Sequence, residues 1–229
     1  MNTQDKVKYV LHKFNCVSTR RSNYEPQWRD INKYILPERG KNFGGKTSEG
    51  SPINQQTFDS TAIKACEDLA SGLQSMLTSP SARWFQLSPG DRYTTENSLA
   101  ARDWIQTVEN IMYFVFQSPQ MKFYNNTHQC YLDIAAFGTA VMLIEADTQR
   151  RLIKFKSIQL DECYIDEDSF GEIDTLFRKF EYSPGQIIEE FRDNLSQESI
   201  FELEDMIEKS PTRKIEILHA VFPRRTRNE

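Results

Sequence analysis

The feature that most constrains this fold is a change in hydrophobic period at Gly138. Before this glycine, non-polar residues recur every three or four positions, which is typical of amphipathic helices. After it come short runs rich in β-branched and aromatic residues, separated by turn residues, as in strands. A glycine suits the end of a helix because it adopts positive φ without strain. The pattern therefore predicts an α+β fold, with N-terminal helices followed by a small antiparallel β unit and further helices.

Helix start and stop signals place the helices of the first part of the chain. Pro26 suits a first helical turn, Asp59 or Ser60 can cap a helix, and Pro80 follows that helix. We expect helices over residues 6–16, 26–36, 58–77, 96–116 and 121–136. The inward face predicted for the helix over 58–77 consists of Ala62, Ala65, Leu69, Leu73, Met76 and Leu77. The inward face predicted for the helix over 96–116 consists of Trp104, Val108, Ile111, Met112 and Val115.

The second part of the chain alternates strands with two helices. We expect a short early strand over 84–87, then strands over 140–145, 152–156, 163–166, 173–182 and 214–222, with helices over 183–191 and 198–209. No clean linker is visible, so the sequence predicts one α+β region over 1–229. Its parts are a helical arm (1–57) with a mobile loop at 41–56, a helical part (58–138) and a β-rich mixed part (139–229).

Composition is typical of a globular chain that stays in the cytoplasm where it is made and has no membrane partner. The 229 residues carry a net charge of −5, and the apolar runs are too short to cross a bilayer. The start lacks the apolar core of a signal peptide. Cys16, Cys66, Cys130 and Cys163 are widely spaced, with no histidine near enough to suggest a zinc site, so we expect reduced, mostly packed thiols.

Charge is distributed unevenly along the chain. Residues 1–46 hold ten Lys/Arg against four Asp/Glu, whereas residues 157–177 hold seven acidic residues and no basic one. The tail from Pro211 is basic again. These runs are either solvated faces or complementary patches that meet between neighbouring subunits of a ring.

The acidic run over 161–168 is the first place to look for metal catalysis, because two-metal nucleases need several converging carboxylates. Adjacent residues of a strand point to opposite faces, so these ligands would diverge. A metal-dependent nuclease or phosphohydrolase remains the alternative function, against a solvated loop or a subunit contact.

Other candidate sites for chemistry are weaker. Residues 40–47 match the Walker A spacing, but a helical pattern precedes them and Ser51-Pro52 cannot start the phosphate-binding helix. His12, His128 and His219 are scattered, with no nucleophile context. Trp28, Arg29, Tyr34, Arg39, Arg83 and Trp84 could stack on nucleic acid, although the net negative charge favours core or interface packing. No residue is predicted to be catalytic, and no cofactor or metal is expected.

Several islands of sequence occur in one order: residues 28–40 (WRDINKYILPERG), 58–85 with its FDSTA and RWF ends, 131–144 (YLDIAAFGTAVMLI), 161–168, 171–180 and 218–224. Together they resemble the head-to-tail connecting (portal) proteins of short-tailed, T7-like bacteriophages. Matched islands in order are much harder to obtain by chance than one motif, and the similarity covers nearly the whole chain.

The resemblance implies a structural, non-enzymatic subunit whose complete form makes a ring at the capsid vertex of the virion, commonly twelve-fold. Through this ring double-stranded DNA is packaged and ejected, and the implied partners are further copies of the chain, capsid, terminase and tail proteins. By the same resemblance, we expect this chain to correspond to the peripheral wing, without the C-terminal stem and clip half. A stand-alone interaction module from a degraded prophage is a third possibility. The residues expected in packing or subunit contacts are Trp28, Tyr34, Pro37, Asp59, Leu69, Leu73, Arg83, Trp84, Phe85, Phe137 and Gly138.

Overall fold

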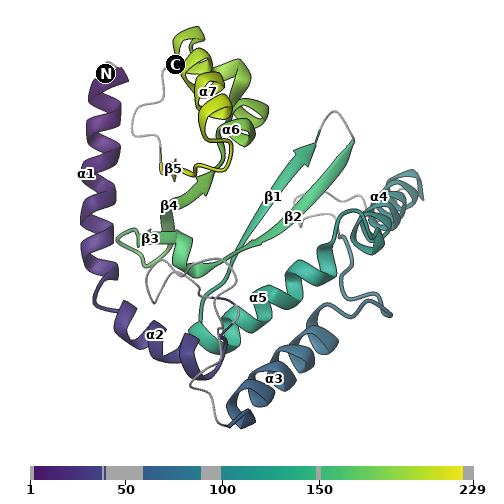
Figure 1. Ribbon diagram of the computed structural model, residues 1–229. Helices are drawn as coiled ribbons and strands as arrows, with labels where there is room; N and C mark the ends of the chain where they lie inside the picture. The colour runs from purple at the N-terminus through teal and green to yellow at the C-terminus, as the bar shows by residue number, and fades with distance from the viewer. Residues whose placement is uncertain (1–2, 38, 40–58, 89–98, 148–150, 224–229) are drawn as a thin grey trace. The chain divides into compact units, whose positions relative to one another are not determined.

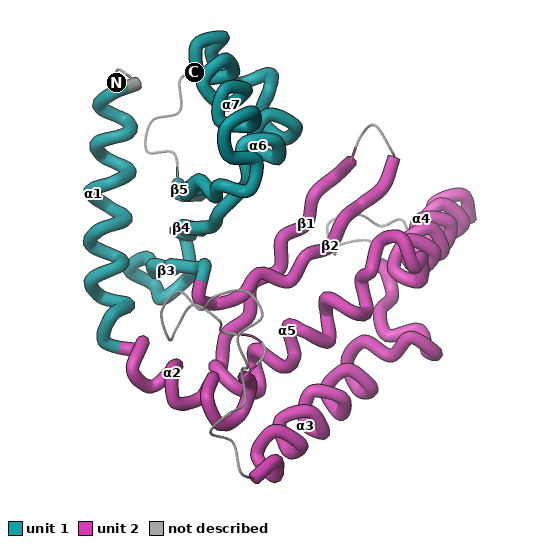
Figure 2. The backbone as a smooth tube through the Cα atoms, in the orientation of Figure 1, with its two compact units in different colours: residues 1–23, 162–229 teal, residues 24–161 magenta. Residues whose placement is uncertain are grey.

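The computed structural model describes residues 3–37, 39, 59–88, 99–147 and 151–223. Its internal contacts group the chain into two compact units, shown in different colours in Figure 2. Unit 1 comprises residues 1–23 and 162–229, and unit 2 comprises residues 24–161. Unit 1 therefore joins the start of the chain to its last third. Neither boundary carries a linker-like sequence, and the single region predicted from the sequence stays a prediction.

The helices of unit 2 are α2 (Glu25–Tyr34), α3 (Thr61–Leu77), α4 (Leu99–Gln117) and α5 (Phe123–Phe137). Helices α3 and α5 lie side by side (Figure 1). Their shared core contains Cys66 and Ala70 from α3 against Tyr131 and Leu132 from α5, together with Leu36. Two small side chains on α3 allow this close approach, and Ala70 is fully buried.

The helix ends follow the signals in the sequence. Pro26 lies in the first turn of α2, and Gly138 ends α5 with a φ of 76°, as predicted. The cap of α3 is divided between two residues: Ser60 holds the cap position, while the Asp59 carboxylate accepts hydrogen bonds from the Thr61 N–H (2.9 Å) and hydroxyl (2.7 Å). These two bonds lower the pKa of Asp59.

Strands β1 (Val141–Asp147) and β2 (Leu152–Ile158) form an antiparallel hairpin in unit 2. The register pairs Val141 with Ile158 and Ile144 with Phe155. Phe155 points into a second core that also contains Met121 and Phe123. The hairpin thereby packs against α5, as Figure 1 shows.

Unit 1 is built from α1 (Thr3–Arg21) and a three-stranded antiparallel sheet in the order β3 (Cys163–Glu167), β4 (Ile173–Tyr182), β5 (Ile215–Val221). Phe14 of α1 meets the ring of Tyr164 edge-on at 4.8 Å and the fully buried ring of Phe177 at 5.7 Å. Offset and edge-on pairs of this kind hold α1 to the sheet.

The remaining elements of unit 1 are α6 (Pro184–Phe191) and α7 (Gln197–Lys209), with a short 3-10 helix at Arg192–Asn194. Another short 3-10 helix, Leu160–Glu162, spans the boundary between the two units. Ser183 and Gln186 form a capping box at the start of α6. Ile187 of α6 and Leu203 of α7 are buried, and the two helices contact one another.

The structure corrects four sequence expectations. The predicted strand over 84–87 is not a strand, although the segment is extended, and α1 continues to Arg21, beyond the expected end. The predicted inward face of α4 is wrong for Trp104 and Ile111, which are exposed, whereas Val115 packs against the core that contains Phe123 and Phe155. The buried residues of α4 are Glu109 and Tyr113.

The predicted face of α3 is also largely outward. Its buried residues are Cys66 and Ala70, and Leu69, Met76 and Leu77 are exposed. The apolar arc of α3 is wider than the part that α5 covers. An amphipathic pattern shows that a face is apolar, but not which neighbour covers it.

Candidate interaction site around residues 83–87

Side chains of α4 hold residues 83–87 in their extended conformation. The Tyr113 hydroxyl accepts a hydrogen bond from the Phe85 N–H (2.9 Å) and donates one to the Phe85 carbonyl (2.7 Å). The Glu109 carboxylate accepts another from the Leu87 N–H (3.2 Å). These side chains supply the bonds that a neighbouring strand would otherwise make. This explains why the segment has the composition of a strand without belonging to a sheet.

Glu109 is a buried carboxylate with partners on both oxygens. Its Oε1 lies 3.0 Å from Nη1 of Arg83, while Oε2 takes the Leu87 N–H. The second terminal nitrogen of Arg83 donates to Asn110 Oδ1 (2.7 Å), and the guanidinium lies 5.2 Å from the centre of the Tyr113 ring. A buried charge is tolerated when it is paired and hydrogen-bonded in this way. Arg83 is therefore held beside the segment that it begins.

Trp84 joins this segment to the second core of unit 2. Its ring is parallel to that of Phe123, with a centroid distance of 6.0 Å and an interplanar angle of 3°, and it stacks on Phe116 at 5.7 Å. Phe116 and Phe123 in turn stack on one another at 4.3 Å. Aromatic clusters like this one contribute a large share of core stability. Trp84 is thus a packing residue of unit 2.

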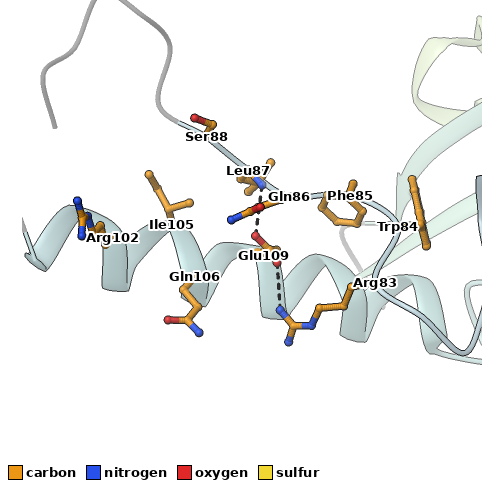
Figure 3. Close-up of a pocket in the computed structure, with 10 residues that line it drawn as sticks. All are labelled: Arg83, Trp84, Phe85, Gln86, Leu87, Ser88, Arg102, Ile105, Gln106 and Glu109. Carbon is orange, nitrogen blue, oxygen red and sulfur yellow. Dashed lines mark hydrogen bonds and ion pairs between the residues drawn. The ribbon is translucent and has the colours of Figure 1, made fainter. Parts of the chain in front are cut away.

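A groove of about 1000 Å³ lies between this segment and α4 (Figure 3). Arg102, Ile105 and Gln106 of α4 line one side, and Gln86 and Leu87 line the other. The lining residues include no histidine, cysteine or lysine, and their carboxylate, Glu109, is occupied by Arg83. General acid-base or nucleophilic chemistry needs such groups. The mixture of apolar and cationic side chains suits a binding surface.

A second ionic anchor of unit 2 involves Arg39, Asp133 and Ser157. Arg39 Nε donates to Asp133 Oδ1 (2.9 Å), and its Nη2 donates to Asp133 Oδ2 and to Ser157 Oγ (2.7 Å). The side chains of Arg39 and Asp133 are 11% and 2% exposed. Burial raises the pKa of Asp133, and the contacts with Arg39 oppose that shift. The anchor ties the chain after α2 to α5 and β2.

The sequence favoured core or interface packing over nucleic-acid stacking for Arg39, and it gave no role to Asp133. The signal that could have indicated the pair is a charged residue inside the apolar run of α5 (YLDIAAF), because a buried carboxylate requires a partner.

The predicted contact residues fall in different parts of unit 2. Arg83, Trp84 and Phe85 lie together at the groove, and Leu73 and Phe137 pack beside the core of α3 and α5. Trp28 stacks on Tyr24 at 6.0 Å. Of the full set, Pro37 is buried, Trp28, Leu73, Trp84, Phe85 and Phe137 are half-buried, and Tyr34, Asp59, Leu69, Arg83 and Gly138 are exposed.

The acidic run that suggested metal catalysis is engaged in other contacts. Glu162 pairs with Arg178 (2.9 Å), Asp166 pairs with Arg20 (2.5 Å), and Asp168 accepts hydrogen bonds from two backbone N–H groups of its own turn. In the part of the chain that the structure describes, no three His, Cys, Asp or Glu side chains gather as metal ligands. Nothing in this geometry supports the nuclease alternative.

The thiols are free, as predicted, with Cys16 exposed and the other three buried. One histidine does lie near a cysteine, because α1 brings His12 Nε2 within 4.0 Å of Cys16 Sγ. Residues four apart are neighbours on a helix. Two ligands are too few for a closed zinc site.

The Walker-like match and the loop 41–56 lie outside the described residues. Among those described, no helix is long and apolar enough for a membrane crossing.

The basic start and the acidic middle of the chain meet within unit 1. Besides the Arg20–Asp166 pair, Arg21 donates to the Cys163 carbonyl (2.6 Å) and lies over the Tyr164 ring at 4.0 Å. These contacts join α1 to β3. Some of the charges that could have formed complementary patches between neighbouring subunits are therefore paired inside one chain.

Comparisons with known proteins extend this description. The family model for bacteriophage head to tail connecting proteins matches residues 7–229. The chain is 27% identical over 228 residues to a probable portal protein of Bordetella phage BPP-1, covering 100% of this chain and 40% of that protein. It is 26% identical over 188 residues to a portal protein of Salmonella phage epsilon15, covering 82% and 33%. The chain thus spans less than half the length of these relatives. It belongs to the bacteriophage head-to-tail connecting protein family.

Proposed function

We propose that this chain is a structural subunit of a phage portal, the ring at one capsid vertex through which double-stranded DNA is packaged and ejected. The observation that carries the proposal is the family match, which extends over residues 7–229. The groove site is consistent with this role, because its charged groups are paired and its aromatic side chains are packed. The role of the chain is to hold and position, without catalysis.

The proposed partners are further copies of the chain, capsid and tail proteins, and the terminase that drives DNA. DNA passes the ring without being held, because tight phosphate binding would stall its movement. The net charge of −5 agrees with weak, sequence-independent contact. The complete protein is proposed to reside in the virion.

The test is immunogold labelling of virions from the phage that encodes this chain, with antibodies raised against the purified 229-residue protein. Label at a single vertex per particle is the expected result. An antibody against the major capsid protein is the control, and it should label the whole shell. Uniform label, or virions without label, would overturn the proposal.

A further inference from the structure

The outward surface of α4 is apolar and has no partner among the described residues. Trp104, Ile111 and Phe114 are 68%, 57% and 74% exposed, and the half-buried Val108 continues the same stripe. Helical geometry places these four residues on one side of α4, away from Glu109 and Tyr113. We call these four residues the α4 outer face. Contiguous exposed apolar patches of this kind mark interaction surfaces.

The outward surface of α3 is apolar as well, but shaped differently. Ala62, Ala65, Leu69, Gly72 and Met76 share one side of the helix, which we call the α3 outer face. Leu69 and Met76 are 53% and 86% exposed, and a Cβ added at Gly72 would meet nothing within 4 Å. Three of the five residues are Ala or Gly. This face is therefore shallow, with room for bulky side chains from outside.

Both outer faces are uncharged and belong to the same unit, and they complement one another in size. The α4 outer face presents an indole, a phenyl ring and two branched aliphatic side chains, whereas the α3 outer face presents small residues around Leu69 and Met76. Helices pack when large side chains of one enter the spaces left by small side chains of the other. A symmetric contact of α4 with α4 would leave the α3 outer face uncovered, whereas an α4-to-α3 contact between copies covers both.

We propose that the α4 outer face of one copy packs against the α3 outer face of the next copy of this chain. Such a contact joins two different surfaces and can therefore repeat from copy to copy until a ring closes. The inference rests on the proposed portal function and names the helices through which neighbouring subunits meet. It also explains why the sequence pattern of both helices predicts burial that unit 2 alone does not provide.

The experiment uses sedimentation velocity over a concentration series with the 229-residue chain and three single variants. Leu69→Glu places a charge on the α3 outer face, and Phe114→Glu places one on the α4 outer face. Phe201→Glu on α7 is the matched control, because Phe201 and Phe114 are both 74% exposed. Circular dichroism and thermal midpoints check that all three variants fold like the parent.

The parent and Phe201→Glu should associate alike. Each outer-face variant should associate at least about tenfold more weakly, because a carboxylate would be buried without a partner. An equimolar mixture of Leu69→Glu and Phe114→Glu should form a 1:1 dimer and nothing larger, because together they retain one intact α4 face and one intact α3 face. Only a contact between two different surfaces predicts this rescue.

A parent chain that stays monomeric, outer-face variants that associate like the parent, or a mixture that stays monomeric would each overturn the inference. These outcomes leave the vertex labelling unaffected, so the inference can fail while the portal function stands. Absence of vertex label would overturn the portal function whatever the sedimentation shows.

Discussion

Arg39 and Asp133 show what a single buried pair does in this chain. Both side chains are almost fully removed from solvent, and Ser157 satisfies a further guanidinium N–H. Desolvation offsets much of the attraction between such charges, so the pair itself adds little net stability. Breaking it from one side is costly, however, because the remaining charge stays buried. The pair therefore specifies how the chain after α2 meets α5.

Replacing Arg39 with Met should lower the free energy of unfolding by about 3–5 kcal/mol at pH 7, because the Asp133 carboxylate loses its partner. Urea denaturation measures the change. Lys209→Met is the control: Lys209 pairs with Asp205 on the exposed surface of α7, and its loss should cost less than about 1 kcal/mol. Equal effects of the two substitutions would contradict the role assigned to Arg39.

The same variant should show a distinctive pH dependence. The pKa of Asp133 lies above its usual 3.8 because of burial, with Arg39 opposing the shift. The native state then binds the proton more tightly than the unfolded chain, so the stability contributed by this group falls as pH rises from 3.8 to the raised pKa. Removing Arg39 raises the pKa further and extends that decline to higher pH. The stability gap between parent and Arg39→Met should therefore widen with rising pH; a gap that is constant from acid to neutral pH would refute this.

At the scale of elements, α4 takes the place of a strand for residues 83–87. Tyr113 and Glu109 lie one helical turn apart and face the same way, so their side chains can reach the backbone N–H groups of Phe85 and Leu87. Arg83 then pairs with Glu109 and closes the arrangement. The groove of Figure 3 lies between residues 83–87 and α4, because long side chains of α4 hold this extended segment beside the helix.

Tyr113→Phe should keep the ring stacked on Phe85 while removing both bonds to its backbone. The expected loss is about 1–3 kcal/mol, since a buried N–H and C=O lose their partner. Hydrogen exchange gives a local readout: the Phe85 amide should exchange faster, while the Leu87 amide, which Glu109 holds, should change less. Tyr34→Phe, at an exposed tyrosine of α2, is the control and should change neither. Unaltered exchange at Phe85 would exclude the clamp.

At the scale of the whole molecule, the two units can be followed separately. All three tryptophans, Trp28, Trp84 and Trp104, belong to unit 2, whereas the sheet of unit 1 is centred on the fully buried Phe177. Tryptophan fluorescence therefore reports on unit 2, and far-UV circular dichroism reports on both units.

Phe177→Ala should destabilise unit 1 by about 3–5 kcal/mol through loss of burial and the cavity that remains. The dichroism transition should then begin at lower urea concentration, while the midpoint of tryptophan fluorescence stays near that of the parent. If both signals shift together, the chain unfolds as the single region that the sequence predicts.

The sequence by itself determined the class of fold, the positions of most helices and strands, and the family. The local signals are the change in hydrophobic period at Gly138, the proline of α2 and the cap of α6. Each depends on backbone preferences of neighbouring residues, so the sequence alone is enough to predict the elements that they bound. Only the tertiary structure decided which apolar face is covered, that Glu109 and Tyr113 point inward while Trp104 and Leu69 point outward, and that Arg39 finds Asp133. These outcomes depend on contacts with residues distant in sequence. A hydrophobic period shows that a face is apolar, but it carries no information about which distant element packs against that face.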